Sequence, residues 1–353
     1  MFGFSEDIPL HDESGVSIRL RPHASEAFVR LIEATDFGSE GLRYRRLGVP
    51  AQIARLECPA FVELHVDKEL VGTYALSARR LRFGDRNAIG VYRGLLTVHP
   101  EARGRGLGRK LVEHTLKWMS VEASTVDEPV LSWGCIESSN SHSRKLLESL
   151  GAARVGSLDS MLVYRQWPRA RIGIEERDAE DWRLAAALSA AGSDSGLRAD
   201  TGTAGRYLAV TQGKEIVAGA RVTITRIDLS RAVGAYGAFH ERVGRFIPAV
   251  RRRFDPKDFT YLRLSDVLVR ADAAAVWKNF LPTLMHEHGV HMAMFVLDPR
   301  SRAYQTLSEG GLFGRFAHST RTQLDVLATT WNAPNNAIEL ISRRPLAIGP
   351  LDV

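Results

Sequence analysis

The spacing of hydrophobic positions predicts that strands and helices alternate along the first half of the chain. Hydrophobic residues alternate with polar ones over residues 16–21 and again over 61–83, where the polar pair Asp67–Lys68 marks the turn of a hairpin. Between these segments, residues 25–38 have the spacing of an amphipathic helix. Residues 39–58 are mixed and crowd several arginines together, which leaves either a helix or a substrate-side loop.

The pattern continues with an apolar strand over residues 94–98 and a helix in which leucines recur at helical spacing from Leu107 onward. Pro100 lies between them, and it ends the strand because it has no N–H to donate to a neighbouring strand. The other elements predicted in this half are a strand at 129–138, a helix at 140–152 that ends at Gly151, and two short closing strands at 153–157 and 161–167.

The same order of elements returns in the second half of the chain. The polar stretch 166–171 contains Pro168 and is typical of a linker. The repeated elements are a strand and helix at 171–192, a hairpin at 206–229, a strand and helix at 261–289, and a strand and helix at 291–313. The chain therefore predicts an α/β fold with mixed sheets, divided into two domains at 1–168 and 172–353.

The stretch 92–110 carries the clearest chemical signal. Its strand leads through Gly104, Gly106 and Gly108 into a helix, and such a glycine loop before a helix exposes backbone N–H groups to an anion. The spacing G-x-G-x-G differs from the dinucleotide-binding fingerprint G-x-G-x-x-G, and the P-loop pattern G-x-x-x-x-G-K-[ST] is absent. The loop therefore predicts a phosphate site of another kind.

The sequence V-x-P-x-x-R-x-x-G-x-G-R at this place resembles the acetyl-CoA loop of the GNAT (Gcn5-related N-acetyltransferase) superfamily, whose signature is [RQ]-x-x-G-x-[GA]. The resemblance covers residues 15–168 and implies a twisted mixed sheet flanked by helices, with acetyl-CoA as cosubstrate and no metal. It implies that Leu96, Thr97 and Val98 run beside the pantetheine arm. The residues that it places around the pyrophosphate are Arg103, Gly104, Arg105, Gly106, Leu107, Gly108 and Arg109.

The helix at 140–152 resembles the family's second motif, in which Asn140 either contacts CoA or caps the helix. Leu147 stands where many members have the tyrosine that protonates the leaving thiolate, so the sequence assigns no general acid, although His142 and Tyr164 are substitutes. For the general base, Glu137 at the end of the preceding strand is the first candidate.

Glu63 and His65 on the hairpin are second candidates for the base, and so is His99, although a lone histidine after a strand is more often structural. Tyr92 and Trp133 are candidates for lining the acceptor groove, although aromatic residues in strands more often belong to the core.

The second half departs from the motif in an informative way. Where the first half has the glycine loop, residues 267–279 read VLVRADAAAVWKN, without glycine and with a shorter loop. We therefore expect a degenerate second domain that does not bind CoA, while residues 1–170 alone still bind it. An inserted basic segment at 231–258 is more often a solvated loop than a dock for an acidic partner.

Composition narrows the class of protein further. The net charge of +6 is spread over both halves, which argues against a nucleic-acid partner, and no apolar stretch is long enough to cross a membrane. The first residues lack the features of a signal peptide, and Cys58 and Cys135 do not form a disulfide framework or a metal site, so we expect a cytoplasmic protein. Pairing with a second copy of the chain stays open.

Three functions compete at this stage. The first is an N-acetyltransferase that moves an acetyl or longer acyl group from CoA to a primary amine of a small molecule or a peptide. The second is a non-catalytic CoA-binding or sensing protein, which the substitution of Leu147 favours. The third is an acyltransferase that takes its group from a carrier protein or an aminoacyl-tRNA, which the intact pyrophosphate loop disfavours.

Overall fold

The structure is a computed structural model that describes most of the chain. The described residues are 6–38, 43–83, 86–178, 181, 184, 187–188, 197–199, 206–229, 255–270, 272–314 and 320–347. Most of the predicted basic insertion at 231–258, and most of the helix predicted within 171–192, lie outside these residues.

The elements of the first half follow the predicted order closely. The 61–83 hairpin turns at Asp67–Lys68, both of which have positive φ as a tight hairpin turn requires, and the Ser25 side chain caps the first helix. The elements are β1 (Ile8–Glu13), β2 (Val16–Arg21), α1 (Glu26–Ala34), β3 (Arg45–Leu47), α2 (Val49–Ile53), β4 (Pro59–Val66), β5 (Glu69–Phe83), β6 (Arg86–Val98), η1 (Pro100–Ala102), α3 (Leu107–Ala123), β7 (Val130–Glu137), α4 (Ser141–Ser149) and β8 (Ala153–Tyr164).

The second half repeats this order over its described residues. Its elements are β9 (Glu175–Arg177), β10 (Leu197–Ala199), β11 (Arg206–Gln212), β12 (Glu215–Asp228), η3 (Pro256–Asp258), β13 (Phe259–Val269), α8 (Ala274–Glu287), β14 (Met292–Leu297), α9 (Arg302–Glu309), β15 (Thr322–Trp331), α11 (Ala337–Ser342) and β16 (Leu346–Ala347).

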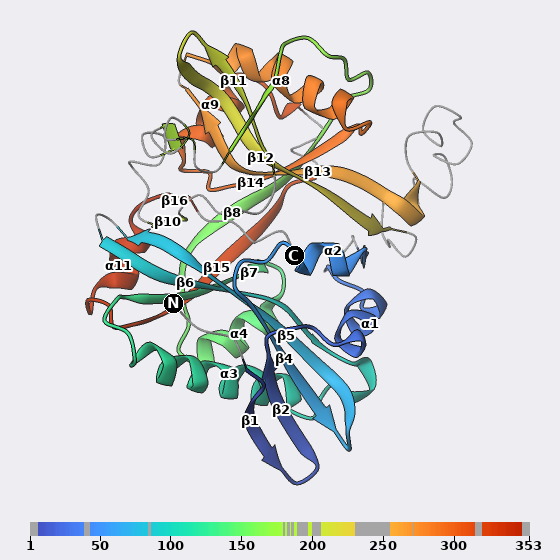
Figure 1. Cartoon of the computed structure of the whole chain (residues 1–353), viewed down its shortest axis with the longest axis vertical. Helices are drawn as coiled ribbons and strands as arrows, with labels where there is room; N and C mark the ends of the chain where they lie inside the picture. The colour runs from blue at the N-terminus through green and yellow to red at the C-terminus, as the bar shows by residue number, and fades with distance from the viewer. Residues whose placement is uncertain are drawn as a thin grey trace.

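One sheet runs through both halves (Figure 1). Its main path is β1-β2-β4-β5-β6-β7-β15-β8-β14-β13-β12-β11-β9, and the two parallel steps, β6 to β7 and β13 to β14, lie at matching places on either side of the centre. The centre is formed by β15 and β8. Each half thus contributes one of its later strands to a position beside the other half, because β15 pairs with β7 and β8 pairs with β14.

The two central strands are related by an approximate two-fold axis. Leu158 pairs with Leu324, and on either side of this pair Asp159 faces Gln323 and Asp325 faces Ser157. Both aspartates are buried and held by arginine: Asp325 by Arg144 and Arg154, each at 2.9 Å, and Asp159 by Arg321 at 2.8 Å. These ion pairs anchor the strands where the two halves interleave.

Helices cover both faces of the first half of the sheet. The face that carries Ile89 and Val91, here called the α3 face, packs against α3 and against Leu147 of α4. The opposite face, here called the α1 face, carries Tyr92 and Trp133 and packs against α1 and α2. In the second half, α8 and α9 pack on a cluster that includes Met161 and Val163 of β8, so the two cores share the central strands.

Three expectations differ from the structure. The two short strands expected within 153–167 form the single strand β8, and the other strand of the pair is β15 from the far end of the chain. The helix expected over 25–38 ends at Ala34, where Thr35 caps it through its N–H. Residues 8–13 form a strand that the polar composition of this segment did not predict.

Candidate functional site

The central feature of the site is a split between two neighbouring parallel strands. β6 and β7 pair only from Ile89–Tyr92 with Val130–Trp133, and beyond this point they separate. From Gly94 to Val98, β6 keeps β5 as a partner on one edge, while its other edge faces the gap. Backbone N–H and C=O groups along that edge are therefore directed toward whatever occupies the split.

A bulge distorts β6 inside the split. The pairing with β5 shifts between Thr73 and Ala75, and Leu95 has a φ of 52°, which is uncommon for a residue with a side chain. The Thr73 hydroxyl donates a hydrogen bond to the Leu95 carbonyl at 3.2 Å. The bulge interrupts the pairing with β5 just before the predicted pantetheine-binding residues Leu96, Thr97 and Val98, and Thr97 and Val98 then pair with β5 again. Bulges are common beside functional sites.

The glycine loop lies between the end of β6 and the start of α3. Gly104 and Gly106 have φ values of 78° and 73°, and a Cβ at either position would meet no atom within 4 Å, so their backbone borders open space. Gly106 is the N-cap of α3 and offers no side chain to the helix. The N–H groups of the first turn of α3 therefore remain available to an anion, at the positive end of a long helix.

Two of the predicted loop arginines have structural contacts. Arg103 donates from Nε to the Val98 carbonyl at 2.9 Å, which ties the loop to the end of β6. Arg109 donates to the Ser149 hydroxyl at 3.0 Å, which joins the first turn of α3 to the last turn of α4. These contacts shape the loop, while the contribution of Arg105 to binding stays a prediction.

The second motif lies on the far side of the split. Asn140 caps α4 by accepting a hydrogen bond from the Ser143 N–H at 3.1 Å, so helix capping is one role of this residue. Glu137 ends β7 in register with Leu324, on the α1 face, and is half-buried. Leu147 is only 5% exposed and packs in the cluster of the α3 face, where it can donate no proton.

Glu63 makes several contacts that serve the fold. It is 1% exposed, lies 3.3 Å from Arg21 and 3.7 Å from His65, and accepts from the Ser25 N–H at the start of α1 at 3.3 Å. It pairs with Thr73 of β5, and the alternation of side chains along both strands places it on the α1 face, like Glu137. Its contacts anchor α1, and its assignment as a base stays a prediction.

The α1 face beside the split gathers aromatic and cationic side chains. Tyr92 and Trp133 pack edge to face, and the Arg79 guanidinium lies 5.2 Å from the centre of the Trp133 ring. Burial raises the pKa of the Cys135 thiol to about 12, while the nearby charges of Arg263 and Arg79 act in the opposite direction, so the thiol stays protonated. Arg263 comes from β13 of the second half.

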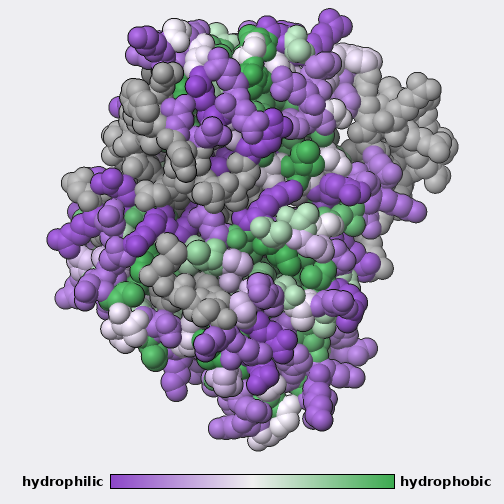
Figure 2. All heavy atoms as spheres, in the orientation of Figure 1, coloured by the Kyte–Doolittle hydropathy of each residue, from purple (hydrophilic) through white to green (hydrophobic). Residues whose placement is uncertain are grey.

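The two arginines of this group were not predicted as site residues. Arg263 lies in a strand that is largely apolar, whereas Arg79 is one of several arginines near the end of β5, and nothing in the local pattern distinguishes it from its neighbours. On the side of the molecule seen in Figure 2, hydrophobic side chains also come to the surface at the level where the two halves meet. The α1 face therefore combines aromatic side chains with positive charge.

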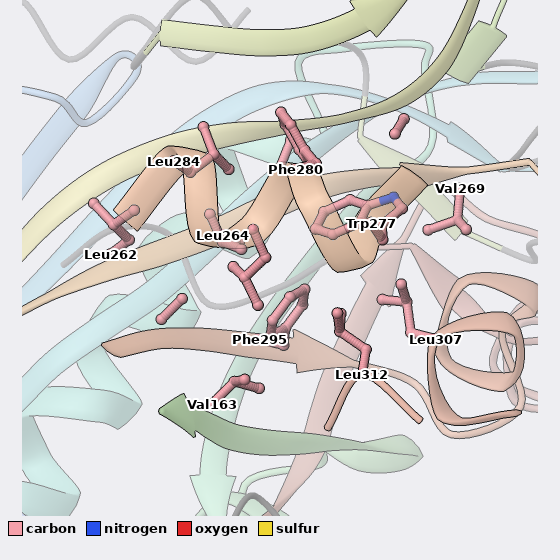
Figure 3. Close-up of a cluster of buried hydrophobic side chains, with 14 of the residues drawn as sticks. Val163, Leu262, Leu264, Val269, Trp277, Phe280, Leu284, Phe295, Leu307 and Leu312 are labelled. Carbon is pink, nitrogen blue, oxygen red and sulfur yellow. The ribbon is translucent and has the colours of Figure 1, made fainter. Parts of the chain in front are cut away.

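The second half contains a similar split that is filled. β13 and β14 pair only from Leu262–Leu264 with Ala293–Phe295, and Asp266 has a φ of 47° at a bulge opposite Gly219 and Arg221. Figure 3 shows Trp277, Phe295 and Leu312 pointing toward one another, with Leu264 and Leu307 around them. Trp277 and Phe295 are fully buried. These side chains pack together against the sheet beside the gap between β13 and β14.

Two further observations concern the described residues alone. They contain no group of three or more histidine, cysteine, aspartate or glutamate residues placed to hold a metal ion. None of the described helices has both the length and the apolar character that a membrane crossing requires.

Comparison with known proteins agrees with the geometry. Residues 28–152 match the model of the Acetyltransferase (GNAT) family, and no curated protein matches the chain. Among solved structures, N-myristoyltransferase from Saccharomyces cerevisiae with bound myristoyl-CoA has a TM-score of 0.63 at 11% identity, with 98% of this chain and 91% of that chain covered. A GCN5-related N-acetyltransferase from Anabaena variabilis has a TM-score of 0.50 at 12% identity, with 88% and 72% covered.

The two kinds of comparison cover different parts of the chain. The match to the yeast enzyme extends over both halves and shows the fold, since its identity is low. The family model covers the split strands β6 and β7, the glycine loop and α3, which are the parts that carry the site. Residues 28–152 of this chain are therefore a domain of the acetyltransferase (GNAT) family.

Proposed function

We propose that this chain is an N-acyltransferase that moves an acyl group, with acetyl as the first candidate, from acyl-CoA to a primary amine. The observation that carries the proposal is the uncapped start of α3 after a glycine loop, at the end of a split strand. A diphosphate fits this place because it needs several N–H donors and favours the positive end of a helix. The family match supports the same reaction class.

The residues on the two faces of the split take different roles in this proposal. The loop residues 103–109 hold the pyrophosphate, and Leu96–Val98 run beside the pantetheine arm, with backbone N–H groups near the thioester carbonyl. The acceptor amine approaches from the α1 face, where Glu137 accepts its proton directly or through water. The amine nitrogen then attacks the carbonyl carbon, the C–S bond breaks, and CoA leaves as the thiolate.

A protein that binds CoA without catalysis is the second candidate. Leu147 favours it, because a buried leucine cannot supply the proton that many relatives provide from a tyrosine. The length of the acyl chain is a further variable, since the yeast enzyme of similar fold has myristoyl-CoA bound in its structure. Whether the chain catalyses transfer and which acyl chain it accepts are both tested with the same set of acyl-CoA donors.

The binding half of the proposal is tested by calorimetry with CoA, acetyl-CoA and myristoyl-CoA. Gly106→Glu should abolish binding, because a side chain and a negative charge would enter the phosphate position. Gly213→Glu is the matched control, since Gly213 also has positive φ and open space around it but lies in a turn of the second half. Binding that survives Gly106→Glu would contradict the assigned loop.

The catalytic half is tested by the release of free thiol from each acyl-CoA in the presence of a panel of primary amines. Thiol release that depends on an amine, and that disappears in Gly106→Glu but not in Gly213→Glu, supports an acyltransferase. Tight binding without thiol release for any donor and amine would support the non-catalytic alternative.

A further inference from the structure

Arg93 of β6 is a buried charge with few hydrogen-bond partners among the described residues. The residue is 3% exposed. Its Nη2 donates to the Leu327 carbonyl of β15 at 3.3 Å, whereas Nε and Nη1 have no hydrogen-bond partner among the described residues. No carboxylate of the described residues lies within ion-pair distance of it. A guanidinium placed in this way is costly unless an anion or a further acceptor joins it.

The position of Arg93 coincides with the point at which the strands separate. It follows Tyr92, the last residue of β6 that pairs with β7, and its side chain lies on the α3 face, as those of Ile89 and Val91 do. Gly134 stands opposite on β7, and a Cβ there would lie 3.2 Å from the Arg93 carbonyl oxygen. The missing side chain at Gly134 lets the arginine reach across β7 to β15.

The neighbours of Arg93 include a tyrosine hydroxyl. Burial raises the pKa of Tyr74, while the charge of Arg93 and a hydrogen bond with the Arg93 side chain act in the opposite direction, so the phenol remains neutral. Leu147, at the position of the missing general acid, packs in the same layer as Leu327. A positive charge thus lies on the same face of the split as Leu147, the residue at the position of the missing general acid.

We propose that Arg93 is a catalytic residue that binds the sulfur of the thioester and stabilises the CoA thiolate as it leaves. This inference rests on the proposed function, because it requires acyl-CoA in the split between β6 and β7. In the step itself, the amine nitrogen forms a bond to the carbonyl carbon and the C–S electron pair goes to sulfur. The ammonium proton goes to Glu137 or to water, and Arg93 keeps its protons and donates hydrogen bonds from Nε and Nη1 to the thiolate.

The experiment follows the thiol of CoA bound to the full chain, by the ultraviolet absorbance of the thiolate as pH is raised. In the wild-type protein the bound thiol should have a pKa lower than that of free CoA by about one unit or more, a tenfold gain in the ratio of thiolate to thiol. Arg93→Met should remove this shift, and Arg93→Lys should keep part of it, because lysine retains the charge without the planar donor pair.

Desulfo-CoA, which lacks the sulfur, is the control ligand. It should bind the wild type and Arg93→Met with equal affinity, which shows that the fold and the loop are intact in the variant. A purely structural role for Arg93 would weaken both ligands together and leave the thiol pKa of bound CoA unchanged. With an acceptor amine, Arg93→Met should also lower kcat by about a hundredfold, the scale of losing one donor to a developing charge.

The outcomes separate this inference from the function on which it rests. A wild-type protein that binds CoA with an unshifted thiol pKa overturns the role of Arg93 and leaves the proposed acyltransferase standing. This result needs no variant, so it holds even if Arg93→Met fails to fold. A protein that binds neither CoA nor desulfo-CoA overturns both proposals.

Discussion

The two halves of the molecule share an arrangement of strands and differ in the connection that follows the split strand. Both have a split pair of parallel strands, and both have a bulge with positive φ, at Leu95 in the first half and at Asp266 in the second. Residues 99–106 connect β6 to α3, whereas only residues 270–273 connect β13 to α8. The same arrangement of strands is thus compatible with either a binding site or a packed hydrophobic core.

The side chains beside the two splits differ in kind as well. In the first half, the loop glycines Gly104 and Gly106 border open space, and the buried Arg93 supplies charge without a carboxylate partner among the described residues. In the second half, Trp277 and Phe295 fill the layer, and Arg221 pairs with Asp266 at 2.8 Å. The site therefore depends on the length of the loop and on the side chains beside the split, rather than on the strand order.

The largest expected effect concerns the exchange of strands between the halves. A fragment that ends at residue 170 lacks β15, so β7 and β8 lose their common neighbour and the buried Val326, Leu327 and Ala328 are missing from the core. We expect this fragment to be unfolded or aggregated. Circular dichroism and size-exclusion chromatography measure it, and addition of a peptide covering 320–347 should partly restore structure.

That outcome replaces the simpler expectation from the sequence, in which residues 1–170 alone bind acetyl-CoA. A soluble, cooperatively folding fragment that binds CoA without the peptide would show that the exchange of β15 is dispensable. The halves would then be separable units, as the repeat in the sequence suggested.

The next largest effect concerns the buried side chains that pack beside the gap between β13 and β14. Trp277→Ala should lower the free energy of unfolding by about 3–5 kcal/mol, because a fully buried indole and its hydrogen bond to the Leu268 carbonyl are lost. It should not create a second CoA site, since the glycine loop is still absent. Denaturant unfolding measures the loss, and Ile224→Ala, at an exposed position, is the control with little effect.

A smaller effect distinguishes two acidic residues at matching places. Glu137 and Asp298 each stand before the N-cap of the following helix, but Asp298 is buried and accepts from Arg300 and from the Leu346 N–H at 2.9 Å. Glu137→Gln should lower kcat about a hundredfold if Glu137 is the base. Asp298→Asn should instead lower stability by about 1.5–3 kcal/mol and leave kcat unchanged.

These two variants are read with the steady-state rate of thiol release and with denaturant unfolding. An unchanged kcat in Glu137→Gln at every pH would remove Glu137 from the mechanism and direct attention to Glu63 or to water. A fall in kcat for Asp298→Asn at full stability would show that the second half takes part in the chemistry.

The smallest effect concerns the two helix caps. Asn140→Ala and Ser301→Ala each remove a side-chain acceptor from the start of a helix, α4 and α9 respectively, and each should lower stability by about 1 kcal/mol. If Asn140 also contacts CoA, only its variant should weaken CoA binding further, by calorimetry. Equal CoA affinities in both variants would limit Asn140 to capping.

Much of the fold and the position of the binding loop could be predicted from local patterns. The hairpin turn at Asp67–Lys68, the strand at 130–137 and the glycine loop follow from residues that are neighbours in sequence. The place of β15 could not be predicted, because its partners on β7 and β8 lie far away in the chain and its pattern says nothing of register. The same reason hid Arg79, Arg93 and Arg263, whose environment arises only when distant strands meet.

The central claim is that one half of the molecule binds CoA and the other does not. Calorimetric titration of the full chain with CoA tests it most directly, with the Gly106→Glu variant measured beside the wild type. The account predicts one CoA per chain in the wild type and none in Gly106→Glu. A stoichiometry of two, or one CoA that remains bound in Gly106→Glu, would place a binding site in the second half and contradict the account.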